Sequence, residues 1–189
     1  MGQRGGAADL DALLARIAVR DRTAMRAFYE AVGPDLHRFI QTRLNDPHEA
    51  ADVLQETMLE VWRQAHAFER RSAVRTWVFS IARNKAIDRV RRSAPTGPAP
   101  DEEIADAAPD PEAAMAALQD GDRLRECIGS LKTVHRAAIQ LAYFRDLPYG
   151  EIAQIENCSI GTVKTRIHHA KRLLLHCLSK KPSRRGGGV

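Results

Sequence analysis

Residues 159–172 read Ser-Ile-Gly-Thr-Val-Lys-Thr-Arg-Ile-His-His-Ala-Lys-Arg, and this stretch decides how the C-terminal part of the chain folds. Its apolar residues recur at helical spacing and continue beyond it, as Ile160, Val163, Ile167, Ala170, Leu174 and Leu178. Such a pattern predicts an amphipathic helix, with Ser159 as its N-cap. A short helix is expected over about 149–155, and residues 157–159 form the turn between the two. Short helix, tight turn and basic amphipathic helix are typical of a helix-turn-helix.

The polar surface of the final helix carries hydrogen-bond donors suited to DNA. With the apolar face turned inward, the outer and flanking surfaces present Thr162, Lys164, Thr165, Arg166, His168, His169 and Arg172. No acidic residue follows Glu156. Lys and Arg bond guanine edges or phosphates, and Thr can do either. We therefore expect this helix to contact DNA, although on charge alone a merely solvated basic face stays open.

Helix-period patterns also dominate the rest of the chain, so the predicted fold class is all-α. Further helices are expected over about 10–17, 23–32, 36–44, 54–65, 72–92, 118–128 and 134–142. The helix over 23–32 is expected to stop before Gly33-Pro34. Ser72 is the expected N-cap of the helix over 72–92. Trp62 and Trp77 lie on apolar stripes and are expected in the core rather than stacked on bases, whereas Phe79 could serve either role.

Composition divides the chain into two small helical domains and a connector. Residues 93–120 hold seven acidic residues and no Lys or Arg, whereas the whole chain has a net charge of +5. The proline-rich run from Ser93 has no apolar periodicity and is expected to be a flexible acidic linker. The predicted parts are a domain over 1–92, a linker over 93–117, a helix-turn-helix domain over 118–180 and a disordered tail over 181–189.

Cysteine usage and hydropathy bear on the compartment. Cys127, Cys158 and Cys177 are odd in number and widely spaced, which favours reduced thiols over a disulfide framework. The chain has no secretory signal, and no stretch approaches the roughly 18 apolar residues that span a bilayer. We therefore expect a cytoplasmic protein without membrane insertion. His168, His169, His176 and Cys177 are spread around the helix, so neither a metal site nor a cofactor is expected.

Two segments upstream of the linker complete a pattern with the helix-turn-helix. Asp52-Val53-Leu54-Gln55-Glu56-Thr57-Met58-Leu59-Glu60-Val61-Trp62 and Thr76-Trp77-Val78-Phe79-Ser80-Ile81-Ala82-Arg83-Asn84 precede it in that order. Together they resemble bacterial sigma factors of the extracytoplasmic-function (ECF) type. The first two segments are similar to region 2 of that family, and 149–172 is similar to region 4. The resemblance extends from about residue 10 to residue 178.

The resemblance implies contacts for individual residues. Core RNA polymerase would be bound through its β′ clamp helices and β flap, the former by Asp52, Gln55 and Glu56. The −10 element would be recognised and opened by Phe68, Glu69, Arg70, Arg71, Arg83, Asn84, Asp88 and Arg91. The −35 element would be read by Arg145, Lys164, Thr165, Arg166, His168, His169 and Arg172. The family further implies an anti-sigma factor that clamps the two domains and hides both DNA surfaces.

The favoured function is therefore promoter recognition and melting for core RNA polymerase. The sequence shows no catalytic constellation and indicates no small-molecule substrate, so no enzyme activity is expected. Two alternatives stay open. One is a stand-alone helix-turn-helix repressor or activator, although we find no separate dimerisation element. The other is a regulatory interaction module whose basic tail binds polyanions without sequence preference.

Overall fold

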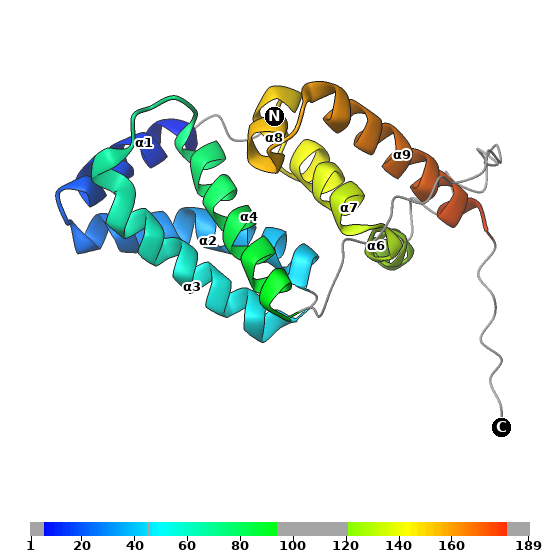
Figure 1. Ribbon diagram of the computed structural model, residues 1–189, viewed down its shortest axis with the longest axis horizontal. Coiled ribbons are helices and arrows are strands. Elements are labelled where there is room, and N and C mark those ends of the chain that lie inside the picture. Colours follow the sequence, from blue (N-terminus) through cyan, green and yellow to red (C-terminus); the bar gives the residue numbers. More distant parts are fainter. Residues whose placement is uncertain (1–5, 45, 94–120, 181–189) are drawn as a thin grey trace.

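The chain forms two helical domains that lie side by side (Figure 1). The computed structural model describes residues 6–44, 46–93 and 121–180, and every regular element within those ranges is a helix. The first domain contains α1 (Gly6–Ala18), α2 (Arg22–Leu44), α3 (Pro47–Gln64), the short η1 (Ala65–Ala67) and α4 (Val74–Ser93). The second contains α6 (Gly121–Ser130), α7 (Thr133–Ile139), η2 (Gln140–Phe144), α8 (Tyr149–Glu156) and α9 (Ile160–Ser179). The predicted all-α class with two domains is confirmed. None of these helices is long and apolar enough to cross a membrane.

The first domain is a bundle in which α1, α3 and α4 pack around α2. Leu10, Leu14 and Ile17 of α1 are buried, as their spacing predicts. Asp46 begins α3 by accepting hydrogen bonds from the backbone N–H groups of His48 and Glu49, which satisfies donors that the first turn leaves free.

Two predictions about helix ends in this domain are wrong. The helices expected over 23–32 and 36–44 form the single helix α2, with Pro34 inside it. Val32, Gly33 and Leu36 are all buried around that proline, so packing outweighs the loss of one backbone hydrogen bond. The expected N-cap Ser72 also lies too early, because α4 begins at Val74.

The second domain contains the predicted helix-turn-helix. Asn157 ends α8 in the left-handed conformation, with φ of 49° and ψ of 54°, which asparagine tolerates better than most residues. The Oγ of Ser159 accepts a hydrogen bond of 3.0 Å from the backbone N–H of Thr162 and caps α9 as predicted. Val163, Ile167 and Ala170 bury the apolar face of α9.

The prediction of reduced cysteines is wrong for two of the three. Cys127 of α6 and Cys177 of α9 form a disulfide, with their Cα atoms 5.8 Å apart, and Cys158 is free. The pairing depends on α6 packing across the C-terminal half of α9, which a sequence separation of 50 residues does not reveal. The predicted linker over 93–117 lies outside the described residues except for Ser93, which belongs to α4, and the tail over 181–189 lies outside them entirely.

The two domains share one hydrophobic cluster. It includes Phe39 and Phe79 of the first domain and Leu141, Ile152 and Ile155 of the second. Contact is made chiefly where α8 packs on α4 and α7 on α2.

Candidate nucleic-acid and polymerase-binding surfaces

The exposed part of α9 supplies the first surface. Lys164, Thr165 and His168 are exposed, while His169 and Arg172 are half-buried. The hydroxyl of Thr165 donates to the backbone oxygen of Gly161 at 3.1 Å. The first half of the helix therefore exposes the Lys164 ammonium and the Thr165 side chain, whose hydroxyl oxygen and methyl group are the kinds of group that contact base edges.

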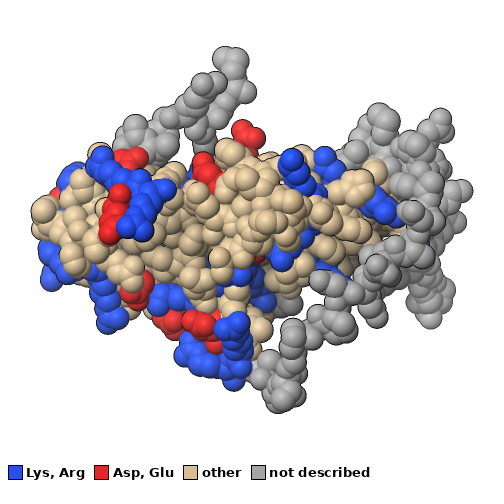
Figure 2. Space-filling view, turned by 45° about the horizontal axis from the view of Figure 1, so that its top comes forward, with Lys and Arg blue, Asp and Glu red and all other residues tan. Residues whose placement is uncertain are grey.

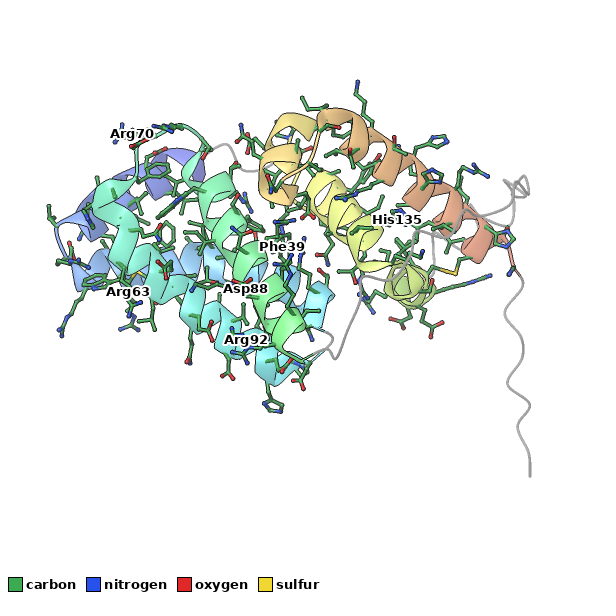
Figure 3. All side chains as sticks on the ribbon, viewed as in Figure 1. Phe39, Arg63, Arg70, Asp88, Arg92 and His135 are labelled. Carbon is green, nitrogen blue, oxygen red and sulfur yellow. A yellow bond between two sulfur atoms is a disulfide. The ribbon has the colours of Figure 1, made fainter. Side chains whose placement is uncertain are left out.

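Histidines from two helices meet at the second half of this surface. His135 of α7, labelled in Figure 3, lies beside α9, and its ring stacks on that of His169 with centroids 6.1 Å apart. The ring of His168 meets that of His169 edge-on, also at 6.1 Å. His135 was not among the predicted contacts, because only the packing of α7 on α9 brings it to this place.

The two remaining arginines of the predicted −35 set are engaged by carboxylates. Arg166 lies 3.9 Å from an oxygen of Glu156. Arg145 lies 2.7 Å from an oxygen of Asp35 in the first domain, with its side chain only 14% exposed. Burial lowers the pKa of the Arg145 guanidinium below its ordinary value, and the charge of Asp35 opposes that shift. The structure thus separates Arg145 from the outward face of α9.

The predicted −10 residues lie on a loop and along α4. In the loop, Phe68 packs against Trp77, with ring centroids 4.9 Å apart, and Arg71 pairs with Glu69 at 2.6 Å. Arg70 has a positive φ of 56° and is exposed. Figure 3 shows Arg70 and Asp88 well apart, one in the loop and the other near the end of α4.

On α4 itself, Asn84, Asp88 and Arg91 are exposed, and Arg83 is half-buried and donates to the side chain of Asn84 at 3.0 Å. Trp62 and Trp77 are partly buried against the core, as predicted. Phe79, left open between core and base stacking, is fully buried.

The third surface lies on α3. Asp52 and Gln55 are exposed, and Glu56 is half-buried and pairs with Arg89 of α4 at 2.7 Å. Beside them is an open pocket of about 540 Å³, lined by Arg22, Met25, Tyr29, Gln55, Met58, Leu59 and Trp62. Sequence reasoning missed Leu59, which is 58% exposed. The sequence signal for an exposed Leu59 was its position directly after Met58, which belongs to the buried face of α3 with Leu54 and Val61.

The positive charge on the face of the molecule seen in Figure 2 is distributed over several separate groups and does not form one continuous basic patch. Figure 2 shows Lys and Arg in separate groups at the ends and lower edge of the molecule, with acidic residues among several of them. The broad middle of this face is neither basic nor acidic. Further cationic groups lie between the domains, where Arg43 of α2 forms a buried ion pair with Glu156 of α8.

Comparison with known proteins assigns both domains. Residues 28–96 match the family Sigma-70 region 2, and residues 121–174 match Sigma-70, region 4. Two solved structures share the fold. CnrH in complex with the cytosolic domain of CnrY has a TM-score of 0.63 and 23% identity, covering 88% of this chain and 94% of that one. The sigma factor RpoE in complex with the anti-sigma factor NepR from Bartonella quintana has a TM-score of 0.61 and 22% identity, covering 82% and 97%.

Similarity in sequence extends over nearly the whole chain. The ECF RNA polymerase sigma factor SigK of Mycolicibacterium vanbaalenii is 34% identical over 176 residues, which cover 90% of each chain. SigK of Mycobacterium tuberculosis is 33% identical over 179 residues, covering 90% of this chain and 94% of the relative. With regions 2 and 4 in the same order and this extent of identity, the chain belongs to the ECF RNA polymerase sigma factors, which initiate transcription and are not enzymes.

Proposed function

We propose that this sigma factor reads the −35 element with the outward face of α9. The observation that carries the proposal is the exposure of Lys164, Thr165 and His168 on a helix whose opposite face is buried in the domain. An ammonium group can bond the O6 and N7 atoms of guanine, and a threonine can bond a base edge or touch a thymine methyl. His169 and Arg172 flank this face, and Arg166 supports it from beside the turn.

The first domain opens the −10 element in this proposal. Glu69, Arg70 and Arg71 supply charged groups at the loop, and Asn84, Asp88 and Arg91 follow along α4. Extruding a base costs a few kcal/mol, which hydrogen bonds and stacking in a pocket offset. Because Phe68 packs on Trp77, it forms the wall of that pocket rather than a free stacking platform.

Core polymerase docks on both domains. On α3, Asp52, Gln55 and Glu56 contact the β′ clamp helices, and the adjoining apolar pocket receives their apolar side chains. In the second domain, Tyr143 and Phe144 are 53% and 56% exposed, which suits them to the β flap. The ammonium of Lys171 lies 5.1 Å from the Tyr143 ring centre, and a hydrogen bond to Tyr143 raises the Lys171 pKa above its ordinary value.

An anti-sigma factor completes the proposed set of partners. The structures of CnrH and RpoE were solved with the cytosolic domain of CnrY and with the anti-sigma factor NepR, and their fold is that of this chain. We infer a partner of the same kind, acting in the cytoplasm, where it would hold the two domains and cover their DNA surfaces.

Run-off transcription with purified core polymerase on a genomic fragment library tests the proposal. Discrete start sites that share upstream −35 and −10 sequences are expected only when this chain is added. Lys164→Ala should reduce initiation about tenfold or more, since a good base contact contributes about 1–3 kcal/mol. Arg26→Ala is the matched control, because Arg26 is an exposed cation on α2 that pairs with Glu30.

Two negative results of this experiment would refute separate parts of the proposal. Absence of core-dependent initiation, together with tight binding of the chain alone to duplex DNA, would refute the proposal and favour a stand-alone repressor or activator. Equal losses for Lys164→Ala and Arg26→Ala would refute base reading by α9.

A further inference from the structure

The helix α8 packs on α4 of the first domain (Figure 1). Two carboxylates of α8 accept hydrogen bonds from side chains of the first domain. Glu151 accepts a hydrogen bond of 2.5 Å from the hydroxyl of Thr76. Glu156 accepts one from the guanidinium of Arg43, and both of these side chains are only 5% exposed. The helix that precedes the DNA-reading helix is therefore attached to the first domain through its acidic groups.

Positive charge exceeds negative charge around Arg43. Burial lowers the pKa of the Arg43 guanidinium, Glu156 opposes that shift, and the nearby charges of Arg83 and Arg136 lower the pKa further. Arg166 also lies 3.9 Å from an oxygen of Glu156. Nitrogen-bearing side chains accordingly gather beside Phe39, between α4 and α7 (Figure 3). One carboxylate thus lies among several arginines, an arrangement better suited to an anion of higher charge.

The donors on the first domain share one face. Thr76 and Arg83 are seven residues apart on α4 and so lie on the same side of that helix, and Arg43 reaches this side from the end of α2. The Nε atoms of Arg75 and Arg83 are buried and donate no hydrogen bond within the described residues. Guanidinium and hydroxyl groups are among the side-chain groups that bond phosphate oxygens of DNA.

We propose that Arg43, Thr76 and Arg83 form a phosphate-binding surface for promoter DNA, which Glu151 and Glu156 occupy in place of phosphates while α8 packs on α4. The proposal rests on the function proposed above and adds a surface to it. DNA and the second domain compete for the same donors. Separation of the domains also breaks the pair between Arg145 and Asp35, so one movement releases cationic groups on both sides.

The test is binding of the full chain to a fluorescein-labelled duplex of random sequence, followed by fluorescence anisotropy over a salt series. Glu156→Gln should increase affinity about tenfold at low salt, the effect of one charged hydrogen bond gained. Adding Arg43→Gln to that variant should abolish the gain and reduce the slope of log affinity against log salt by about 0.9, the value for one phosphate contact. In the unaltered chain, Arg43→Gln should leave the slope unchanged, because Glu156 already occupies Arg43.

Two further variants separate phosphate binding from simple loss of structure. Arg26→Gln, added to Glu156→Gln, removes the same charge from an exposed site and should preserve the gain in affinity. Glu151→Gln leaves the pair of Arg43 and Glu156 intact and should increase affinity about threefold, with circular dichroism melts confirming that it folds. Equal affinities and slopes for the unaltered chain, Glu151→Gln and Glu156→Gln would overturn the proposal. Equal effects of Arg43→Gln and Arg26→Gln in the Glu156→Gln variant would overturn it as well.

The outcome is distinguishable from failure of the proposed function, because this assay contains no polymerase. If the unaltered chain directs discrete initiation but Arg43→Gln does not change the salt slope of the Glu156→Gln variant, only the phosphate-binding surface is refuted. If the slopes respond as stated and no core-dependent initiation occurs, the surface stands as a site for DNA phosphates and promoter direction is refuted.

Discussion

Cutting the covalent link between α6 and α9 tests how the second domain is held together. The helix α6 has ten residues, and an isolated helix of that length is marginal in water. Its apolar anchorage is small, because Cys127 and Leu178 form the buried part of the cluster there, with Leu124, Leu174 and Cys177 packed against them. We therefore expect the disulfide to supply much of the free energy that keeps α6 on α9.

The magnitude follows from the length of the closed loop. Cys127 and Cys177 are 50 residues apart, for which the loop-closure relation gives an entropy of about 14 cal/mol/K, or about 4 kcal/mol at 25 °C. For a chain of this size, each kcal/mol shifts the midpoint of thermal unfolding by about 2–4 °C. Cys177→Ser should therefore lower the midpoint by about 8–16 °C.

The assay is thermal and urea unfolding followed by far-ultraviolet circular dichroism, with and without a reducing agent. The unaltered chain under reducing conditions should behave as Cys177→Ser does, whereas Cys158→Ser, which removes the free cysteine, should keep the response to reductant. Hydrogen exchange should show the backbone amides of α6 losing protection before those of α8. An unfolding free energy that does not change with reductant, in a chain shown by mass spectrometry to be oxidised beforehand, would refute the reasoning.

Three further outcomes are expected. Ser159→Ala should lower the unfolding free energy by about 1 kcal/mol, because it removes the cap of α9. Ser72 lies before the start of α4, so Ser72→Ala should change the unfolding free energy by less than about 0.5 kcal/mol. Urea titration measures both changes. Hydrogen bonds from the backbone of Ala24, and then from Arg16, lower the pKa of Asp21 from 3.8. The stabilisation from the Asp21 carboxylate is therefore present above pH 3.8 and is lost as pH falls through the lowered pKa. Asp21→Asn should destabilise the chain at pH 7 and have no effect in strong acid. Thermal melts over a pH series would show this difference. Leu59→Asp should abolish co-purification with core polymerase while leaving the melting temperature unchanged, because the side chain is 58% exposed; retained binding would exclude this face of α3 as the docking surface.

Much of the secondary structure could be read from the sequence because it is local. The helix-turn-helix depends on apolar spacing, a capping serine and turn residues within a single stretch, and those signals identified α8, the turn and α9. The exposed donors of α9 follow from the same periodicity. The break expected at Gly33-Pro34 failed because burial of Val32 and Leu36 outweighed a local preference.

Long-range relations could not be read in this way. The pair of Arg43 and Glu156 joins residues 113 positions apart, and the disulfide joins residues 50 apart. His135 likewise owes its place beside His169 to the packing of α7 on α9.

The sequence by itself determined the all-helical class, the two-part organisation and the residues that α9 turns outward, since periodicity and capping act within a few turns of one helix. Only the tertiary structure decided which charges meet. The packing of α8 on α4 brought the carboxylates of α8 to the first domain, and the packing of α6 on α9 brought Cys127 to Cys177. Burial, ion pairing and disulfide formation depend on such contacts between elements that are remote in the chain.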